Sequence, residues 1–110
     1  MPTVEQIDPG FSTADASHPS INYDSGNLYL KFIDWRERTV LVTFHDTCRF
    51  EWVDEPDDSI YGEPYDGSCV IRESNWIPDK GGSNCQHYRL NFNACGGRLD
   101  VAFVDMKVET

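Results

Sequence analysis

The chain has 110 residues, which is enough for one domain and too few for two independent cores. It carries 19 acidic and 9 basic residues, and its net charge of −10 disfavours contact with nucleic-acid phosphates and with anionic membranes. Its 39% hydrophobic and 13% aromatic content excludes a disordered acidic tail, and no stretch reaches the roughly 18 apolar residues of a membrane span.

Residues 1–20 are polar and rich in proline, and we expect them to form an N-terminal arm with at most one short turn around Val4 and Ile7. This segment has neither the basic region nor the apolar run of a signal peptide, so we expect a cytoplasmic protein. The sequence changes to short β-type runs at Ile21, and residues 21–110 are predicted to form a single β domain.

Short runs rich in β-branched and aromatic residues alternate with turn residues, and no window of about a dozen residues shows helical spacing of its apolar side chains. The runs predict strands at 20–24, 27–33, 38–45, 48–53, 67–76, 85–94 and 98–108. We therefore expect an all-β fold. Six to seven antiparallel strands would form a consecutive meander that curls into a sandwich or a half-open barrel.

Apolar alternation sets the register of a first hairpin across a three-residue connection. Its apolar face is predicted to pair Phe32 with Val40, Leu30 with Val42 and Leu28 with Phe44. A turn at 46–48 would bring the following strand beside this hairpin, with Phe44 opposite Phe50 and Val42 opposite Trp52. The other face of these strands is mixed, so the sheet is expected to be partly covered on both sides.

A second hairpin is predicted to turn on Gly96–Gly97, because a two-residue type I′ turn needs positive φ at both centres. That turn sets Phe92 opposite Val101 and Leu90 opposite Phe103, all on one apolar face. Beyond Phe103 the apolar residues change parity, which predicts a β-bulge near 102–104.

The opposite face of this hairpin carries a row of polar side chains, the candidate ligand residues Arg89, Asn91, Asn93 and Asp100, with His87 at the beginning of the strand. One reading is a solvated sheet face, because antiparallel sheets commonly expose one side. The functional reading is a surface for a small ligand or a partner.

Residues 54–66 form a long acidic loop with six carboxylates, two tyrosines and no basic residue. Charge steers the encounter with a basic protein and aromatic rings supply contact energy, so the loop suits such a partner. Its candidate partner-binding residues are Asp54, Glu55, Asp57, Asp58, Tyr61, Glu63, Tyr65 and Asp66. The other reading is a solubilising loop. A second loop, 77–84, has turn composition and is expected to be mobile.

The four cysteines are Cys48, Cys69, Cys85 and Cys95. Without an export signal, free thiols are favoured, while two disulfides in any of three pairings remain open. Zinc would need the imperfect pairs His45-x-x-Cys48 and Cys85-x-His87, and we expect no bound metal or other cofactor. A Cys48–His87 nucleophilic pair has no supporting motif, so we expect a protein without enzymatic activity.

Two stretches, 28–52 (LYLKFIDWRERTVLVTFHDTCRFEW) and 87–101 (HYRLNFNACGGRLDV), resemble small acidic bacterial proteins, some of which are similar to immunity proteins encoded beside secreted toxins. The resemblance is one of texture and carries over no catalytic residue. It implies a cytosolic β-rich protein that neutralises a toxin by binding it. Phage-encoded inhibitors of bacterial defence nucleases have the same size and charge.

These observations predict a binding or inhibitor protein whose acidic surface, including loop 54–66, holds a basic partner such as a toxin or nuclease domain. The alternative is a small-molecule-binding or zinc-assisted β-barrel module that uses the polar face of the 87–101 hairpin. We expect no nucleic-acid or membrane partner, and either a monomer or a dimer paired through an exposed edge strand.

Overall fold

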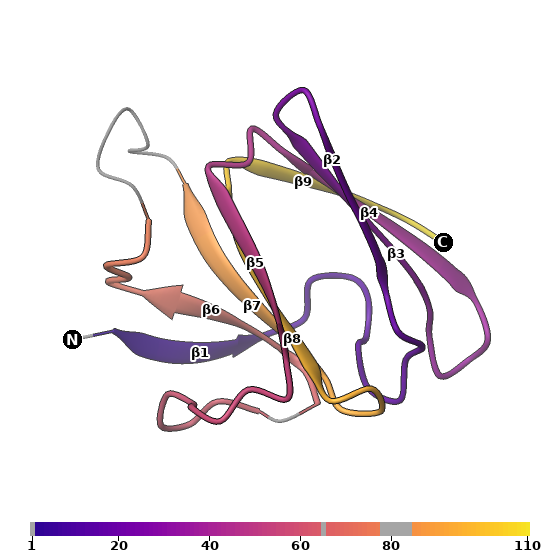
Figure 1. Cartoon of the computed structure of the whole chain (residues 1–110), viewed down its shortest axis with the longest axis horizontal. Coiled ribbons are helices and arrows are strands. Elements are labelled where there is room, and N and C mark those ends of the chain that lie inside the picture. Colours follow the sequence, from indigo (N-terminus) through magenta and orange to yellow (C-terminus); the bar gives the residue numbers. More distant parts are fainter. Residues whose placement is uncertain (1, 65, 78–84) are drawn as a thin grey trace.

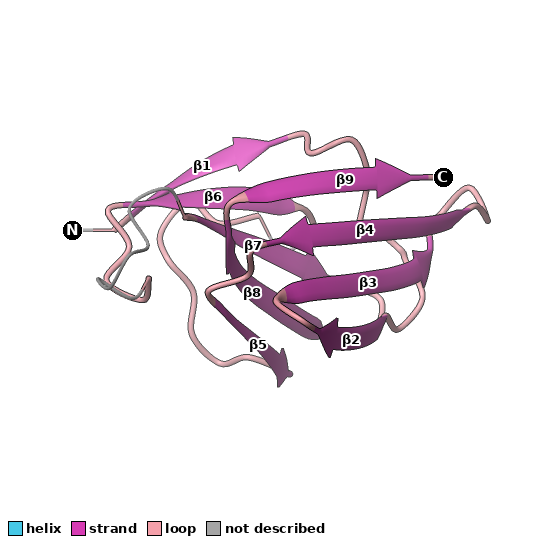
Figure 2. Ribbon diagram, turned by 90° about the horizontal axis from the view of Figure 1, so that it is seen from above, coloured by secondary structure: helices cyan, strands magenta, loops and turns pink. Residues whose placement is uncertain are grey.

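A computed structural model of the chain describes residues 2–64, 66–77 and 85–110. Within them, nine antiparallel strands form two sheets that pack face to face, and no helix occurs (Figures 1 and 2). The strands are β1 (Thr3–Ile7), β2 (Ser20–Asp24), β3 (Asn27–Ile33), β4 (Thr39–His45), β5 (Arg49–Asp54), β6 (Ser68–Arg72), β7 (Gln86–Phe92), β8 (Gly97–Phe103) and β9 (Asp105–Glu109). Tyr65 and most of the predicted 77–84 loop lie outside the described residues.

The five-stranded sheet has the order β1-β6-β7-β8-β5, and the four-stranded sheet has the order β2-β3-β4-β9. The all-β prediction is confirmed, and of its two forms the structure adopts the sandwich. The described residues form nine strands rather than six or seven, and their order is not the predicted consecutive meander, because the chain crosses between the sheets. In the described chain no helix is long and apolar enough to cross a membrane.

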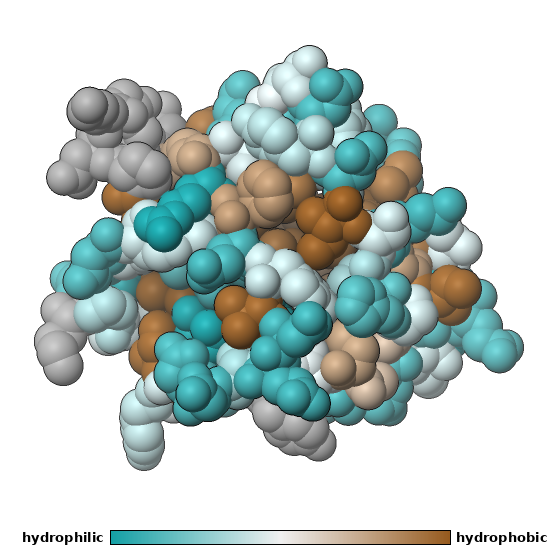
Figure 3. Space-filling model, in the orientation of Figure 1, coloured by the Kyte–Doolittle hydropathy of each residue, from teal (hydrophilic) through white to brown (hydrophobic). Residues whose placement is uncertain are grey.

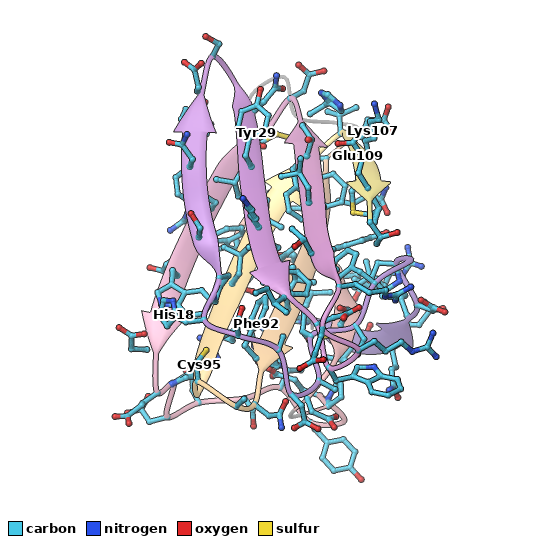
Figure 4. The ribbon with its side chains drawn as sticks, turned by 90° about the vertical axis from the view of Figure 1, so that its right-hand side faces the viewer. His18, Tyr29, Phe92, Cys95, Lys107 and Glu109 are labelled. Carbon is cyan, nitrogen blue, oxygen red and sulfur yellow. A yellow bond between two sulfur atoms is a disulfide. The ribbon has the colours of Figure 1, made fainter. Side chains whose placement is uncertain are left out.

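Large apolar side chains from both inner faces fill the space between the sheets. Phe44 of β4 contacts Phe103 of β8 with ring centroids 4.9 Å apart, and Phe32 of β3 meets Phe92 of β7 edge to face at 5.4 Å. Phe92 lies between the sheets in Figure 4. Such inward-facing positions recur at every second residue, which is why alternation predicted them.

The register predicted for the first hairpin is confirmed. β3 pairs with β4 so that Phe32 faces Val40 and Leu28 faces Phe44. These side chains are all buried, whereas those at the intervening positions, such as Tyr29, point to the outer face shown toward the viewer in Figure 4.

The predicted pairing of Phe44 with Phe50 is wrong, because the chain changes sheets between β4 and β5. Phe44 pairs instead with Met106 of β9, and Phe50 pairs with Val101 of β8. At the crossing, the amide of Cys48 donates to the carbonyl of Ala102 at 2.7 Å. Phe44 points into the core both in the predicted turn and in the observed crossing between sheets. The expected burial of Phe44 therefore could not distinguish the two arrangements.

A second crossing replaces the predicted bulge at 102–104. β8 ends at Phe103 in the five-stranded sheet, and β9 begins at Asp105 in the other sheet. Val104 joins them, and its amide donates to the carbonyl of His45 at 3.1 Å. The apolar parity changes here because the two sheets bury opposite faces of the chain.

The predicted register of the second hairpin is wrong by four residues. Phe92 pairs with Gly97 and Leu90 with Leu99, so the connection holds four residues, 93–96, rather than two. Gly96 alone of the two glycines has a positive φ, of 75°. Gly97 is needed for space, because a Cβ there would collide with the Trp52 indole. An even shift keeps each side chain on its predicted face.

The N-terminal segment is part of the sandwich, so the expectation of at most a short turn at Val4–Ile7 is wrong. β1 pairs along its whole length with β6, a partner that local sequence patterns do not reveal. Farther along, Phe11 and Ala16 are buried in the core. The hydroxyl of Thr13 donates to the carbonyl of Asn91 at 2.6 Å.

Candidate functional site

The outer face of the five-stranded sheet carries a cluster of polar side chains that are buried rather than wet. We call it the outer-face cluster, and its members are His87, Arg89, Asn91, Arg98 and Asp100, each no more than 7% exposed. Charged residues are seldom buried to this extent unless they are paired. The expectation of a solvated face is therefore wrong.

Asp100, on the interior strand β8, lies at the middle of the cluster. Its Oδ1 accepts hydrogen bonds from His87 Nε2 at 2.7 Å and from Arg89 Nε at 2.8 Å. Arg89 Nη2 reaches Oδ2 at 3.3 Å, and Arg98 Nε lies 3.4 Å from the same oxygen. Burial by itself would raise the pKa of Asp100, but the bonds from His87 and Arg89 outweigh it and lower the pKa.

Arg89 also joins the sheet to the acidic loop. Its Nη1 donates to Glu63 Oε2 at 3.0 Å, and the amide of Asn91 donates to the other oxygen of Glu63 at 2.9 Å. Burial alone would lower the pKa of Arg89, yet the two carboxylates of Asp100 and Glu63 raise it. Arg89 is thus held as a cation between two anions.

A second contact anchors the loop at its other end. Arg98 Nη1 donates to the backbone carbonyl of Asp58 at 2.8 Å, and Nη2 reaches the Asp58 carboxylate at 3.3 Å. The Glu63 side chain is only 5% exposed, so this carboxylate serves the fold. The loop leaves the end of β5 and runs along the bottom of the sheet in Figure 1.

Most of the other candidate partner-binding residues that the structure describes are exposed. Asp54, Glu55, Asp57 and Asp58 are exposed, and Tyr61 is 100% exposed. Asp66 is half-buried beside β6, and Tyr65 lies outside the described residues. In the orientation of Figure 1, hydrophilic side chains cover much of the surface, with smaller apolar patches among them (Figure 3).

Of the four residues predicted as a ligand face, the structure brings together Arg89, Asn91 and Asp100. Asn93 is separate, because the longer hairpin connection places it in the turn. Its side chain there binds Asp15, accepting from the backbone amide at 2.8 Å and donating to the carboxylate at 3.0 Å.

A cavity of about 440 Å³ opens over one end of the cluster. Among its lining residues are Arg49, Ser74, Trp76, His87, Arg98 and Asp100. The Trp76 ring stacks on His87 with centroids 4.6 Å apart, and the Arg49 guanidinium lies 4.5 Å above the Trp76 ring. Ser74 Oγ is 2.7 Å from His87 Nδ1.

Cys48 and Cys85 form a disulfide near this cavity, so the expectation of free thiols is wrong for these two residues. Cys69 and Cys95 are free, and burial raises the pKa of the Cys69 thiol to about 11. The zinc alternative needs His87, but both of its ring nitrogens are engaged, by Ser74 and Asp100. No group of three or more metal-ligating side chains occurs in the described parts of the chain.

The sequence did not reveal Ser74 and Trp76 as members of the site. Alternation placed Arg98 on the same polar face, but it was not chosen as a ligand residue, and Glu63 was assigned to partner binding instead. The correct hairpin register was the available signal, since it places Arg89 directly opposite Asp100, whereas the two-residue turn placed Asn93 there. No family model, curated protein or solved structure matches the chain.

Proposed function

We propose that the protein acts by binding a basic protein, such as a toxin or nuclease domain, through the exposed acidic surface of loop 54–66. One observation carries the proposal: Tyr61 is fully exposed on a loop that is held against the sheet by a buried ion pair, Arg89–Glu63, and by contacts of Arg98 with Asp58. A large aromatic ring left in water gains the most when a partner covers it, and tyrosine is enriched among the residues that dominate interfaces.

Anchoring of the loop supports this function because binding costs less when the contacting segment is already ordered. Glu63 holds one end of the exposed stretch through Arg89 and Asn91, and Arg98 holds the backbone at Asp58. A loop that served only as a solubilising segment would need neither contact. The anchors keep Tyr61 between two fixed points.

Charge supports a basic partner. The chain has a net charge of −10, and Asp54, Glu55, Asp57 and Asp58 lie exposed together before Tyr61. Such a field speeds association with a cation-rich surface and loses range as salt is added, with a Debye length of about 10 Å at 0.1 M and 3 Å at 1 M.

The resemblance to immunity proteins suggests that the partner is a toxin and that the protein works in the cytoplasm. Disulfides persist mainly in oxidising compartments, and in the cytosol they are usually transient. The Cys48–Cys85 bond therefore gives the cytoplasmic assignment a test of its own, which is the redox state of these cysteines in protein taken directly from cells.

The binding test is capture of proteins from a lysate of the source organism, with washes at low and at high salt. The double variant Glu55→Lys/Asp57→Lys reverses loop charges whose side chains are exposed, and Tyr61→Ala removes the ring. The matched control, Asp24→Lys/Glu109→Lys, makes the same net change on β2 and β9. We expect one basic protein to be retained at low salt by the wild type and the control, and lost in both loop variants.

Two outcomes would contradict the proposal. One is that no basic protein is retained by the wild type at low salt. The other is that the loop variants and the control retain the same protein equally well, which would place the contact on another surface.

A second candidate function is a small-molecule module on the outer face. The cavity of about 440 Å³ favours it, because its size is within the range of small-ligand pockets and buried charged groups line it. Stoichiometric release of a small molecule from denatured protein, detected by mass spectrometry, would support this candidate.

A further inference from the structure

The cavity wall contains a hydrogen-bonded chain of hydroxyl, imidazole and carboxylate. Ser74 Oγ lies 2.7 Å from His87 Nδ1, and His87 Nε2 lies 2.7 Å from Asp100 Oδ1. His87 and Asp100 are buried, whereas Ser74 is half-buried and lines the cavity. The three residues come from β7, β8 and the segment after β6.

The partners of Asp100 indicate which atom is the donor in its hydrogen bond with His87. Its carboxylate accepts from the Arg89 guanidinium, which only donates, so Asp100 is an acceptor toward His87 as well. His87 Nε2 therefore carries the hydrogen, and in the neutral imidazole Nδ1 is the acceptor. The Ser74 hydroxyl must then donate to Nδ1, as a serine does when a histidine base activates it.

Packing holds the histidine and the serine in place. Trp76 stacks on the His87 ring at an interplanar angle of 27°, and its backbone amide donates to Ser74 Oγ at 3.2 Å. The Cys48–Cys85 disulfide ties down the chain two residues before His87. Hydrogen bonds at both ring nitrogens and the stacked Trp76 ring fix the orientation of His87. A base held in this way is prepared for proton transfer.

We infer that Ser74 is a nucleophile and that the cavity is an acyl-transfer site for a small carboxylic ester. Ser74 and His87 are the catalytic residues, and Asp100 is a positioning residue that sets the tautomer of His87. The inference concerns the cavity rather than loop 54–66 and does not rest on the proposed binding function.

Ser74 Oγ attacks the ester carbonyl carbon while its proton moves to His87 Nδ1, and the electron pair of the carbonyl double bond moves to oxygen. The C–O bond to the alcohol breaks, and the alcohol leaves with the proton from His87. Water then attacks the acyl-serine, gives its proton to His87, and releases the acid as Ser74 recovers its hydrogen.

Positive charge on the cavity wall suits the negative oxygen formed in the first step. The Arg49 guanidinium is at the cavity beside Trp76, whose carbonyl it binds at 3.2 Å. Arg98 lines the cavity as well, although its Nε is buried and lies 3.4 Å from Asp100 Oδ2. Cations already in position stabilise developing charge without reorganisation.

A purely structural network is the competing explanation, and the contacts distinguish the two. The anchors of loop 54–66 are Arg89, Asn91 and Arg98, none of which needs Ser74. Within the described residues, the side chain of Ser74 adds its bonds to His87 and to the Trp76 amide. A structural serine needs no access to the cavity, and Ser74 has it.

The test is reaction of the full chain with a fluorophosphonate probe, which forms an Oγ–P bond and releases fluoride as the serine proton passes to His87. The modified residue is identified by mass spectrometry. We expect labelling at Ser74 in the wild type, none at this position in Ser74→Ala, and labelling at least about 100-fold slower in His87→Gln. Ser59→Ala, which removes an exposed serine outside this cavity, is the control and should label at the wild-type rate.

Near-UV circular dichroism of each variant ensures that slow labelling reflects chemistry rather than unfolding. A folded His87→Gln variant that labels at the wild-type rate would overturn the role of His87. A wild type that is not labelled at Ser74, or that is labelled equally at Ser59, would overturn the site. Hydrolysis of p-nitrophenyl acetate by the same variants should follow the same order.

Discussion

Arg89 and Asp100 face each other across β7 and β8, and both side chains are buried. Two hydrogen bonds of 2.8 and 3.3 Å join the guanidinium to the carboxylate. The pair lies where the sheet, the acidic loop and the cavity meet, because Arg89 also binds Glu63 and Asp100 also binds His87. One ion pair thus supports both the anchored loop and the proposed nucleophile.

Arg89→Ala should strongly destabilise the fold. It leaves Asp100 and Glu63 buried without their shared cation, and breaking a buried pair in this way costs about 3–5 kcal/mol. The free energy of unfolding, measured by urea titration, checks this. Arg72→Ala is the control, since the exposed Arg72–Glu5 pair should contribute at most about 1 kcal/mol. Equal losses in the two variants would mean that burial of the Arg89 pair adds nothing.

Glu63→Ala should release the loop while the sandwich stays folded. Glu63 binds the loop amide of Ile60 as well as Arg89 and Asn91, so its loss frees the exposed stretch from the sheet. Hydrogen exchange should become faster at residues 57–63, with strands β3 and β4 unchanged. Glu55→Ala alters an exposed side chain of the same loop and should leave the exchange pattern as it is. Unchanged protection in Glu63→Ala would show that other contacts order the loop.

Acid should weaken the fold through Asp100. Its pKa is lowered in the folded state from an ordinary value of 3.8, so the unfolded chain binds the proton first as pH falls. The stabilisation is present above about pH 4 and is lost as pH falls through the folded-state pKa. The readout is the slope of unfolding free energy against pH, which should be less steep in Asp100→Asn below pH 4. Identical slopes in the variant and the wild type would remove Asp100 as the cause.

The cysteines should differ in chemistry. Protein denatured without reductant should show two titratable thiols, Cys69 and Cys95, and a linked pair of peptides from Cys48 and Cys85. The bond spans 37 residues, so Cys48→Ser/Cys85→Ser should lose up to about 4 kcal/mol on the chain-entropy model. Cys95→Ser is the control and should change stability little. Four free thiols in the denatured wild type would rule out the bond.

Alternation along the sequence was sufficient to predict the β class, the register of β3 with β4 and the two faces of β7 and β8. The period of two in a strand is local, and an even error in register leaves it intact. The register of β7 with β8 was predicted wrongly because Gly97 was interpreted as a turn residue. A glycine is required at position 97 because the Trp52 indole, on another strand, leaves no room for a Cβ. No local sequence pattern shows this contact.

The candidate site was predicted only in part for a similar reason. Arg89, Asn91 and Asp100 were placed on one face by alternation, but whether that face is wet depends on a loop 26 residues away in sequence from Arg89. Ser74 and His87 meet across a segment without alternation. The two segments where the chain crosses between the sheets have the residue composition of a turn and of a bulge. The sequence therefore did not distinguish these crossings from a turn or a bulge within one sheet.

The two crossings also decide when the protein can fold as it emerges from the ribosome. β8 is the partner of both β5 and β7, and β9 closes the sheet that β2, β3 and β4 begin. The five-stranded sheet lacks β8 until synthesis has passed residue 103, and the four-stranded sheet lacks β9 until it has passed residue 109. Until then the nascent chain exposes the edge of β4 and the apolar side chains of β5. Those surfaces are the ones a chaperone would have to shield during translation.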